Sequence, residues 1–537
     1  MADSSKVDIG ENRELKEENE KRGESTRFHY ILGWRLYTMA LGLGLALFLV
    51  NFEVTIVSAA LVSITNDLKE FNKSSWIVTG YLTTYIGGQV IWAKLSDLFG
   101  RKRTFIVALL IFVAFSGGCG GAQTMTQLIV FRVLQGIGGS GLFSLTMIMF
   151  YELVPPEEYA RYTSVVMVMY TLSLVLGPIF GGLISLRTTW RWVFLLNVPA
   201  GVALGALLWL VIPVDFPFQG LDRPKKRPSF KIVDFTGAFL LVSSLVLIIT
   251  GFEEAASALS WVSGSALGPI LASLVTSVAF LISQRHVSRA GSLREPVFPW
   301  HFCKSRVVIG LFLNAFTTGA VGVTCIILIP IRYQTVVQSN PLQAAVRLIP
   351  FTIAGPSGTV IASGLAKRYK VPPIYLTLGA DLLQIIGLAA ISQGSGSNGD
   401  WTALWGLEVI VALGMGGCMG TLTLMTPPTV GEKDLAVGTA AFNQFRVLGG
   451  ALTLSIVTAV GNNWVKYQLL GTLAEKDIMA IFRSTDAIDL FPGDVESVIR
   501  GTFAQSFNLQ MRILLGIAVA SVFSTLLMWQ RNQIRIL

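Results

Sequence analysis

Charged residues are scarce in this chain of 537 residues, because Asp, Glu, Lys and Arg together make up only 14% of it. Hydrophobic residues make up 52%, and the mean hydropathy is +0.62. No soluble domain of this length can hide so much apolar surface in its core, so this surface must face lipid. The net charge of +9 would suggest nucleic-acid binding in a soluble protein, but basic residues beside membrane spans set topology instead. We therefore expect a membrane protein with no nucleic-acid partner.

Cysteine and histidine are also rare, with four and three residues. The cysteines show neither paired nor metal-ligand spacing, which favours buried thiols over disulfides and predicts no metal site. All three histidines lie outside the long apolar segments, so a histidine relay within the membrane is excluded. No Gly-x-x-x-x-Gly-Lys-Ser/Thr pattern occurs, which argues against ATP-driven transport by this chain. We expect no cofactor and no enzymatic activity.

Fourteen predominantly apolar segments are long enough to cross a bilayer, which takes about 20 residues of helix. They lie near residues 36–64, 76–97, 104–122, 126–152, 160–186, 190–213, 234–252, 264–283, 306–332, 346–366, 374–392, 401–426, 434–461 and 512–530. The sequence therefore predicts an all-α membrane protein with fourteen transmembrane helices.

The spacing of these segments divides them into groups of six, two and six, which indicates a duplicated bundle with an inserted pair. Residues Ala93–Leu98 after the second segment resemble Ser363–Arg368 after the tenth, where a duplication would place them. The predicted parts are a disordered cytoplasmic tail at 1–35, an N-terminal six-helix bundle at 36–213, a cytoplasmic loop at 214–233, two inserted helices and a basic linker at 234–305, and a C-terminal six-helix bundle at 306–537 with a long outer loop at 462–511.

Basic residues follow the second, sixth, eighth and tenth segments, whereas most of the alternate loops carry few cations. The positive-inside rule places these basic loops and both termini in the cytoplasm. Arg187, Arg191 and Arg332 run against the rule, while Glu253 and Glu254 fall in an outer loop. We expect a monomer in the plasma membrane rather than the vacuolar membrane.

The turn between the second and third segments combines Asp97, Gly100, Arg101 and Lys102. Glycine permits a tight reversal, the carboxylate accepts hydrogen bonds from backbone N–H groups or an arginine, and the cations hold the turn at anionic headgroups. Such a turn can stabilise one conformation of the bundle over another. A topology anchor without any switching role explains the same residues, and the turn alone does not separate these interpretations.

Two ionisable residues stand in the middle of apolar segments. Arg132 costs about 2.5–3.5 kcal/mol on insertion scales, so it should face the bundle interior or a wet cavity. The charge on Glu53 is similarly expensive, so its protonation should depend on the conformation of the bundle. Glu53 is therefore a candidate proton site, and the alternative is a structural carboxylate neutralised by an internal hydrogen bond or an arginine.

Further embedded charges are Asp381, Glu408 and Arg446, of which Glu408 is near enough to the outer surface to snorkel.

The fifth segment contains Gly177, Pro178, Gly181 and Gly182. Proline removes a backbone donor and bends a helix, while glycines at helical spacing let a partner helix approach closely.

For a substrate cavity, the candidates are the aromatic and polar residues Tyr81, Tyr85, Gln89 and Asn314, because pockets for amphipathic ligands are mostly apolar with a few polar groups. Each of these four residues is also explained by packing alone.

Two of these segments resemble motifs of the major facilitator superfamily. Residues 93–103 are similar to its signature loop, Gly-x-Leu-Ala-Asp-Arg-x-Gly-Arg-Lys, with Leu98 in place of the arginine. Residues 128–138 match its fourth-helix motif at every specified position. The resemblance implies a role in proton transfer for Arg132.

Two more segments resemble motifs of the proton antiporters in this superfamily. Residues 173–182 are similar to the antiporter motif, with Ser173 in place of a glycine. Residues 52–62 are similar to the first-helix motif of the fourteen-span drug:proton antiporters, with Glu53 in place of an aspartate. The four motifs and the fourteen segments together resemble fungal members that expel toxins, drugs or secondary metabolites.

This resemblance implies alternating access, in which two six-helix bundles rock around a central cavity while protons enter and substrate leaves. The expected function is proton-coupled efflux of small amphipathic molecules, with protons, substrate and the lipid bilayer as partners. Two alternatives remain open. One is a proton-coupled importer of a siderophore or amino acid on the same fold, and the other is a membrane sensor that binds its ligand without transport.

Overall fold

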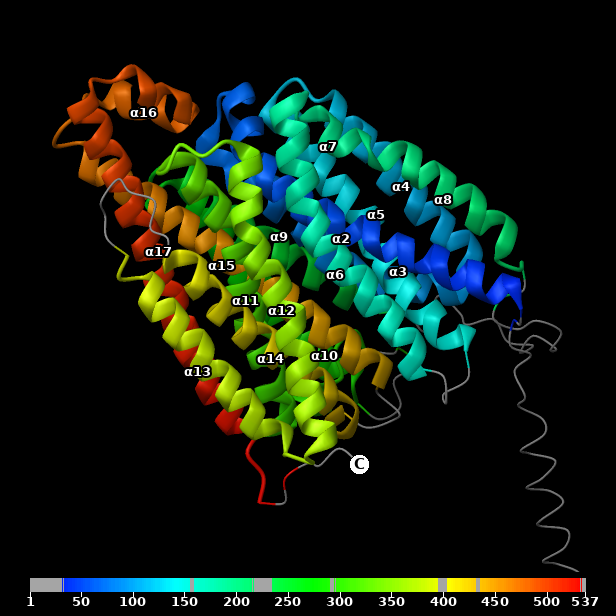
Figure 1. Ribbon diagram of the computed structural model, residues 1–537. Coiled ribbons are helices and arrows are strands. Elements are labelled where there is room, and N and C mark those ends of the chain that lie inside the picture. The colour runs from blue at the N-terminus through cyan, green and yellow to red at the C-terminus, as the bar shows by residue number, and fades with distance from the viewer. Residues whose placement is uncertain are drawn as a thin grey trace, which may run out of the picture.

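The computed structural model describes residues 31, 33–154, 159–214, 216, 234–289, 294, 296–394, 403–430, 435–531 and 533. The predicted cytoplasmic tail and the loop at 214–233 lie almost entirely outside the described residues. Every regular element in the described part is a helix (Figure 1), so the predicted all-α class is confirmed.

The helices fall into three sets along the chain. The first set is α2 Trp34–Leu68, α3 Ser74–Phe99, α4 Arg101–Gly121, α5 Met125–Leu153, α6 Tyr159–Arg187, α7 Arg191–Leu195 and α8 Asn197–Val211. The middle pair is α9 Phe235–Ser257 and α10 Gly264–Val287. The last set is α11 Arg306–Thr335, α12 Pro341–Arg368, α13 Pro373–Ile391, α14 Ala403–Val430, α15 Leu435–Leu469, α16 Glu475–Arg483 and α17 Gly493–Leu527. Short 3-10 helices are η1 Phe71–Lys73, η4 Trp300–Lys304 and η6 Thr485–Leu490.

Each of the fourteen predicted spans coincides with one of these helices, with α7 and α8 together forming the sixth. Thirteen spans in the described chain are long and apolar enough to cross a membrane. The remaining predicted span, α3, has 26 residues but is rich in Thr, Tyr, Gly and Gln. Its polar residues Thr79, Thr83 and Gln89 are buried, because α3 packs against α5, α9 and α15. Its polarity therefore faces protein and not lipid.

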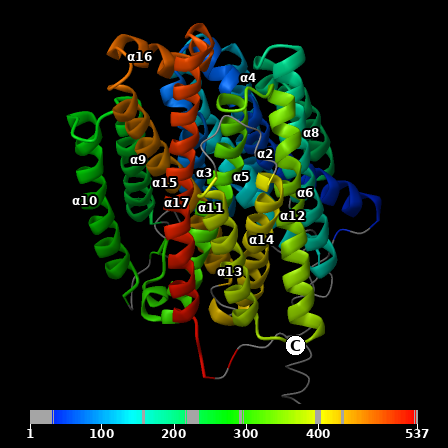
Figure 2. The same cartoon turned by 60° about the vertical axis from the view of Figure 1, so that its left-hand side comes forward.

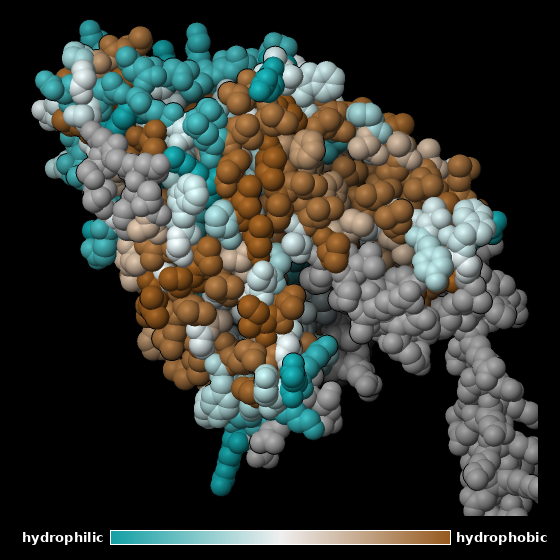
Figure 3. Space-filling model, viewed as in Figure 1, coloured by the Kyte–Doolittle hydropathy of each residue, from teal (hydrophilic) through white to brown (hydrophobic). Residues whose placement is uncertain are grey.

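The helices form two bundles, the first built from α2–α8 and the second from α11–α17 (Figures 1 and 2). The inserted pair, α9 and α10, lies side by side at the edge of the molecule, and α9 packs against α3 of the first bundle and α15 of the second. A broad apolar band covers the visible flank of both bundles (Figure 3), as expected for a surface in contact with lipid acyl chains.

The two bundles converge at the end that carries α16 and fan apart toward the opposite end (Figure 1). At the α16 end, Gln334 Nε2 donates to Ala59 O at 3.3 Å, and Asn66 Nδ2 donates to Asp486 Oδ1 at 2.8 Å. Nearer the middle, Gln444 Nε2 donates to Ile86 O at 3.1 Å. In the described part of the chain, hydrogen bonds therefore connect the two bundles at the α16 end and near the middle.

Residues 462–511, which we expected to form a long loop, are mostly helical. The helix α15 continues to Leu469, α16 and η6 follow, and α17 begins at Gly493. Helix α16 buries Ile478, Ile481 and Phe482 against the ends of α15 and α17 and exposes its charged residues. The loop prediction was wrong because mean polarity does not distinguish a loop from a short amphipathic helix such as α16, or from the polar first half of a long helix such as α17.

Helix α6 packs closely on two neighbours through its glycines. A Cβ on Gly177 would lie 1.9 Å from Thr55 Oγ1, and one on Gly181 would lie 2.1 Å from Ile56 O, both on α2. A Cβ on Gly182 would lie 2.6 Å from Pro341 O at the start of α12. The predicted packing role of these residues is therefore realised at the contacts of α6 with its own bundle and with the other.

We predict that Gly181→Ala lowers the stability of the protein, because the new methyl group meets the α2 backbone and overpacking costs about 1–3 kcal/mol. Gly364→Ala on α12 is the matched control, since its Cβ would meet nothing within 4 Å. Replacing this helical glycine by alanine should leave the stability unchanged or raise it by up to about 1 kcal/mol. Thermal unfolding of both purified variants in detergent measures the difference, and equal midpoints would contradict the close contact.

Candidate functional site

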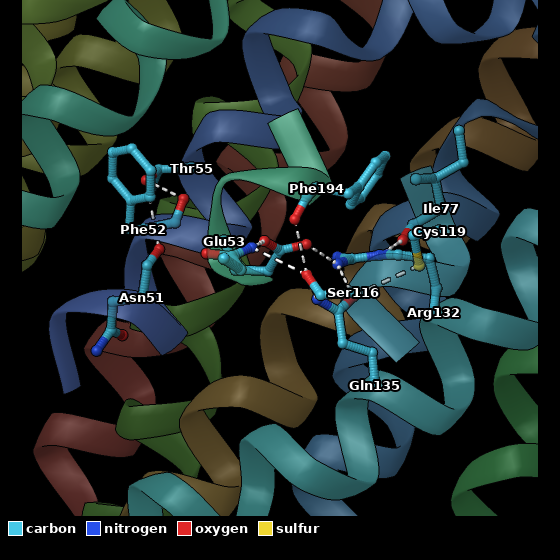
Figure 4. Close-up of polar contacts among 11 residues, drawn as sticks. Asn51, Phe52, Glu53, Thr55, Ile77, Ser116, Cys119, Arg132, Gln135 and Phe194 are labelled. Carbon is cyan, nitrogen blue, oxygen red and sulfur yellow. Dashed lines mark hydrogen bonds and ion pairs between the residues drawn. The ribbon is translucent and has the colours of Figure 1, made fainter. Parts of the chain in front are cut away.

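The two ionisable residues predicted in the first and fourth spans meet inside the first bundle. Arg132 Nη1 on α5 donates to Glu53 Oε1 on α2 at 2.5 Å, and neither side chain has any exposed surface (Figure 4). Glu53 and Arg132 were predicted as separate candidates, and in the structure they form one buried ion pair. Burial of this kind is tolerated only when further hydrogen bonds satisfy both partners.

The guanidinium of Arg132 also donates hydrogen bonds to acceptors within its own bundle. Its Nε donates to Ile77 O at 2.9 Å, and Nη1 also donates to Gln135 Oε1 at 2.8 Å. Its Cζ lies 4.4 Å from the centroid of the Tyr81 ring, a cation–π contact. Among the described residues, Nη2 has no hydrogen-bond partner. Arg132 is therefore held on three sides, with Glu53 as its only counter-ion in the described chain.

The second oxygen of Glu53 belongs to a polar network that spans the bundle. Asn197 Nδ2, at the start of α8, donates to Glu53 Oε2 and also to Ser116 Oγ on α4 at 3.1 Å. Gln135 Nε2 donates to the same Ser116 oxygen at 2.9 Å. The hydroxyl of Ser116 in turn donates to the backbone oxygen of Phe194 at 3.0 Å. Side chains of four helices, α2, α4, α5 and α8, thus belong to one hydrogen-bond network around this carboxylate.

Sequence reasoning missed Asn197 and Ser116. Each is a single polar residue in an otherwise apolar stretch, which is a weak signal, because such residues often bond only to their own helix. Gln135 carried a better signal, since residues three apart on a helix share a face and Arg132 marks that face as polar.

The arrangement gives proton binding at Glu53 a structural consequence. A proton on the carboxylate removes the counter-ion of a fully buried guanidinium, and an uncompensated buried charge is strongly destabilising. Arg132 would then be left with the Gln135 amide oxygen, the Ile77 carbonyl and the Tyr81 ring. The packing of α2 on α5 and α8 therefore depends on the charge of one side chain.

The turn between α3 and α4 is closed by the residues that the sequence singled out. Gly100 has a φ of 92°, in the region that favours glycine. Arg101 Nη1 donates to Asp97 Oδ1 at 2.5 Å, and Arg101 Nη2 donates to Glu152 Oε1 at the end of α5 at 2.7 Å. Lys102 Nζ donates to Ile212 O beyond α8 at 2.7 Å. Glu152 was missed, because its role depends on a contact 51 residues away in the chain.

The four cavity candidates are all buried. Tyr81 stacks on Tyr85 with ring centroids 5.8 Å apart and so lies between it and Arg132. Asn443 Nδ2 on α15 donates to Gln89 Oε1 at 3.4 Å, so Gln89 lies where the two bundles meet. Asn314 Nδ2 donates to Thr525 Oγ1 at 2.7 Å within the second bundle. Of the four, Gln89 has a side-chain hydrogen bond to the opposite bundle.

Three other acids are also fully buried. Asp381 accepts hydrogen bonds from hydroxyl groups of α17. Glu408 accepts one from Tyr333 Oη at 3.2 Å, so the expectation that it snorkels to the surface was wrong. Glu253 does not lie in an outer loop as expected, because α9 continues to Ser257 and carries it into the protein interior. The predicted seventh span stopped one residue before this carboxylate.

We predict that breaking the buried pair destabilises the protein more than replacing it. Glu53→Leu or Arg132→Met alone leaves one buried charge and should cost about 3–5 kcal/mol, whereas the double variant should recover much of this loss. Glu475→Gln is the control, because Glu475 is exposed and its pair with the half-buried Lys466 at 3.7 Å is a surface pair worth about 0–1 kcal/mol. Unfolding free energies in detergent complete the cycle, and additive losses would mean that the pair is not coupled.

Comparison with known proteins identifies the family. The sequence profile described as Major Facilitator Superfamily matches residues 43–454. The MFS-type transporter FPY5 of Fusarium mangiferae is 39% identical over 507 residues, which cover 94% of this chain and 85% of the relative. Multidrug resistance protein 3 of Bacillus subtilis is 32% identical over 432 residues, or 79% of each chain. The MFS-type efflux pump LUC4 of a Fusarium species is 27% identical and covers 93% of this chain and 85% of its own.

Solved structures agree on the fold. A bacterial homologue of the human lysosomal transporter Spinster, in an inward-facing and unoccupied conformation, superposes with a TM-score of 0.67 at 15% identity. The match covers 94% of this chain and 100% of that one. The human organic anion transporter MFSD10 superposes with a TM-score of 0.56 at 13% identity and covers 91% of this chain and 99% of its own. With its membrane-spanning helices, this chain is therefore a multi-pass membrane protein that belongs to the Major Facilitator Superfamily of transporters.

Proposed function

We propose that this protein exports small amphipathic molecules, such as drugs, toxins or secondary metabolites, in exchange for protons. The observation that carries the proposal is the buried Glu53–Arg132 pair, in which a titratable carboxylate holds the only described counter-charge of a membrane-embedded arginine. Protonation is the one change of charge that a chain without a nucleotide-binding pattern can use here. Several relatives whose names include efflux pump or multidrug resistance support the direction and the substrate class.

The orientation of the chain supports export from the cytoplasm. Arg101, Lys102 and Arg103 lie at the end of the first bundle away from α16, and Lys367 with Arg368 lies at the corresponding end of the second. The positive-inside rule makes this the cytoplasmic end. Because the bundles converge at the α16 end (Figure 1), the described conformation is the one that receives substrate from the cytoplasm.

The transport cycle follows from the charge of Glu53. In the described conformation the carboxylate is ionised and paired with Arg132. When the bundles open at the α16 end, a proton from outside binds Glu53, and the return to the cytoplasm-facing state, in which Arg132 and Asn197 bind the ionised carboxylate, releases this proton to the cytoplasm. A proton can bias this equilibrium only by binding the two states with different affinity. The polar network through Asn197 and Ser116 supplies that difference, since it is built around the ionised carboxylate.

The substrate would lie between the two bundles. Gln89 and Asn443 face each other across the bundle contact, and Tyr85 lies one turn from Gln89 on α3. An aromatic ring beside a few amide groups suits an amphipathic ligand, which needs apolar area and limited polar contact. We assign the cavity to this region of α3 and α15.

We predict that cells expressing the protein accumulate less of a fluorescent amphipathic dye, and that a protonophore abolishes the difference. Glu53→Gln should lose the effect while still reaching the membrane, because the amide cannot alternate between charged and neutral forms. Glu475→Gln, an exposed acid on α16, is the matched control and should keep full activity. Accumulation and surface expression are measured in the same cells.

Three results would contradict the proposal in different ways. Higher dye accumulation in expressing cells would support the importer on the same fold. Ligand binding without any flux would support the sensor. Full export by Glu53→Gln would leave transport in place but make the Glu53–Arg132 pair structural.

A further inference from the structure

A second buried carboxylate lies on the inserted helix α9, outside both bundles. Glu253 has no exposed surface. Ser75 Oγ donates to its Oε2 at 2.5 Å, and Thr79 Oγ1 donates to its Oε1 at 2.9 Å, both from α3 of the first bundle. Ser455 Oγ on α15 of the second bundle donates to Oε1 at 2.7 Å. One side chain on the inserted pair thus binds both bundles at once.

The hydrogen bonds of Glu253 differ in kind from those of Glu53. Its three partners are all hydroxyl groups, and no described cation forms an ion pair with it. A hydroxyl can donate to a carboxylate and can also accept from a carboxylic acid, so the site accommodates both protonation states without leaving a buried donor unpaired. The number and strength of the bonds nevertheless change, because bonds to a charged acceptor are about twice as strong.

Backbone contacts fix α9 at the same level. Asn72 Nδ2 in η1 donates to Ser257 O at 2.8 Å, and Asn463 Nδ2 on α15 donates to Ala255 O at 3.0 Å. These bonds hold the last turn of α9 between the start of α3 and the end of α15. Opening of the bundles at the α16 end must therefore strain or break the junction at Glu253.

A small cavity lined by both polar and apolar residues lies beside this junction. Its volume is about 50 Å³, and it lies between the start of α3 and helices α11, α15 and α17. The polar residues that line it include Ser74, Ser75, Arg332, Thr335, Asn462 and Gln510. A site that is polar and larger than about 15 Å³ can hold water. Ser75 both lines this cavity and donates to Glu253, so it connects the carboxylate to the cavity.

The charged groups around the junction are few. Glu254 is the neighbour on α9, Arg332 of α11 lines the far side of the cavity, and Lys73 in η1 is paired with Glu70. The charged residues of α3, α10 and α15 lie further along those helices: Lys94 and Asp97 on α3, Arg285 and His286 on α10, and Arg446 and Lys466 on α15. Glu253 is therefore the acid that joins the two bundles at this level.

We propose that Glu253 is a second proton-binding site, reached from the α16 end through this cavity, and that its protonation weakens the α3–α9–α15 junction and favours opening at that end. The inference rests on the proposed proton-coupled transport, in which the inserted pair would act as a proton-sensitive clasp between the bundles. Glu253 is a positioning residue, since it acts through helix contacts and touches no substrate.

The first test measures proton binding directly and needs no transport. Purified protein in lipid vesicles is titrated while the infrared C=O stretching band of protonated carboxyl groups is recorded. We expect one titrating component to be lost in Glu253→Gln and kept in Glu53→Gln and in Glu254→Gln, the matched control on the same helix. In Ser455→Ala, which keeps the acid, the same component should titrate at higher pH because the charged form loses a donor.

The second test measures opening. Thr458→Cys, which lines the cavity, is introduced into a Cys303→Ser background and treated with a membrane-impermeant thiol reagent from the α16 side. Glu253→Gln, which mimics the protonated acid, should make this cysteine react faster, whereas Glu254→Gln should not.

The outcomes separate this inference from the proposed function. A titrating band that survives in Glu253→Gln, or a band unmoved in Ser455→Ala, would overturn the protonation site. An unchanged thiol reaction rate in Glu253→Gln would overturn the clasp. If both tests give the expected results while dye export fails, the clasp stands and the proposed export is wrong.

Discussion

Hydrocarbon offers no partner to a polar group, and this constraint organises the whole molecule. Every charge and amide inside the membrane must find its partner within the protein. In the first bundle this requirement gathers Glu53, Arg132, Asn197, Gln135 and Ser116 from four helices into one network. In the second bundle, Asp381 collects hydroxyl groups from α17 in the same way. The polar residues therefore specify which helices are neighbours, together with small residues such as Gly177 and Gly181 that allow close helix contact.

The sequence predicted the helices well because a span is a local property, visible in a window of about 20 residues. It also predicted that Glu53 and Arg132 matter, since either charge is costly in lipid on its own. It could not predict that they pair, because they lie 79 residues apart. Glu253 and the segment 462–511 were misassigned for a related reason. Mean hydropathy treats a polar residue as a sign of a loop. Glu253 is instead buried by helices that the window does not contain, and residues 462–511 form helices with exposed polar faces.

The two buried acids at the centre of the proposals differ in their setting. The pair of Glu53 with Arg132 lies within one bundle and is a charge-balanced unit, so its protonation unbalances that bundle. Glu253 lies between bundles, is bound by hydroxyls and belongs to a helix that a plain duplication of six helices would lack. The fold thus contains one buried acid inside a bundle and another at the contact between the bundles. Fourteen helices allow this division because α9 packs against both sides.

The polar side chains of α3 face the protein interior, and this affects how the chain inserts into the membrane. Thr84 Oγ1 donates to Val133 O on α5, Thr79 Oγ1 donates to Glu253 on α9, and Gln89 Oε1 accepts from Asn443 on α15. All three partner helices are synthesised after α3. Alone in lipid, α3 would leave these polar groups without partners, which is costly, so its place in the membrane is stabilised by the helices that follow it. Assembly of this protein is therefore not a sequence of independent insertions, because the stability of an early helix depends on helices that are made later.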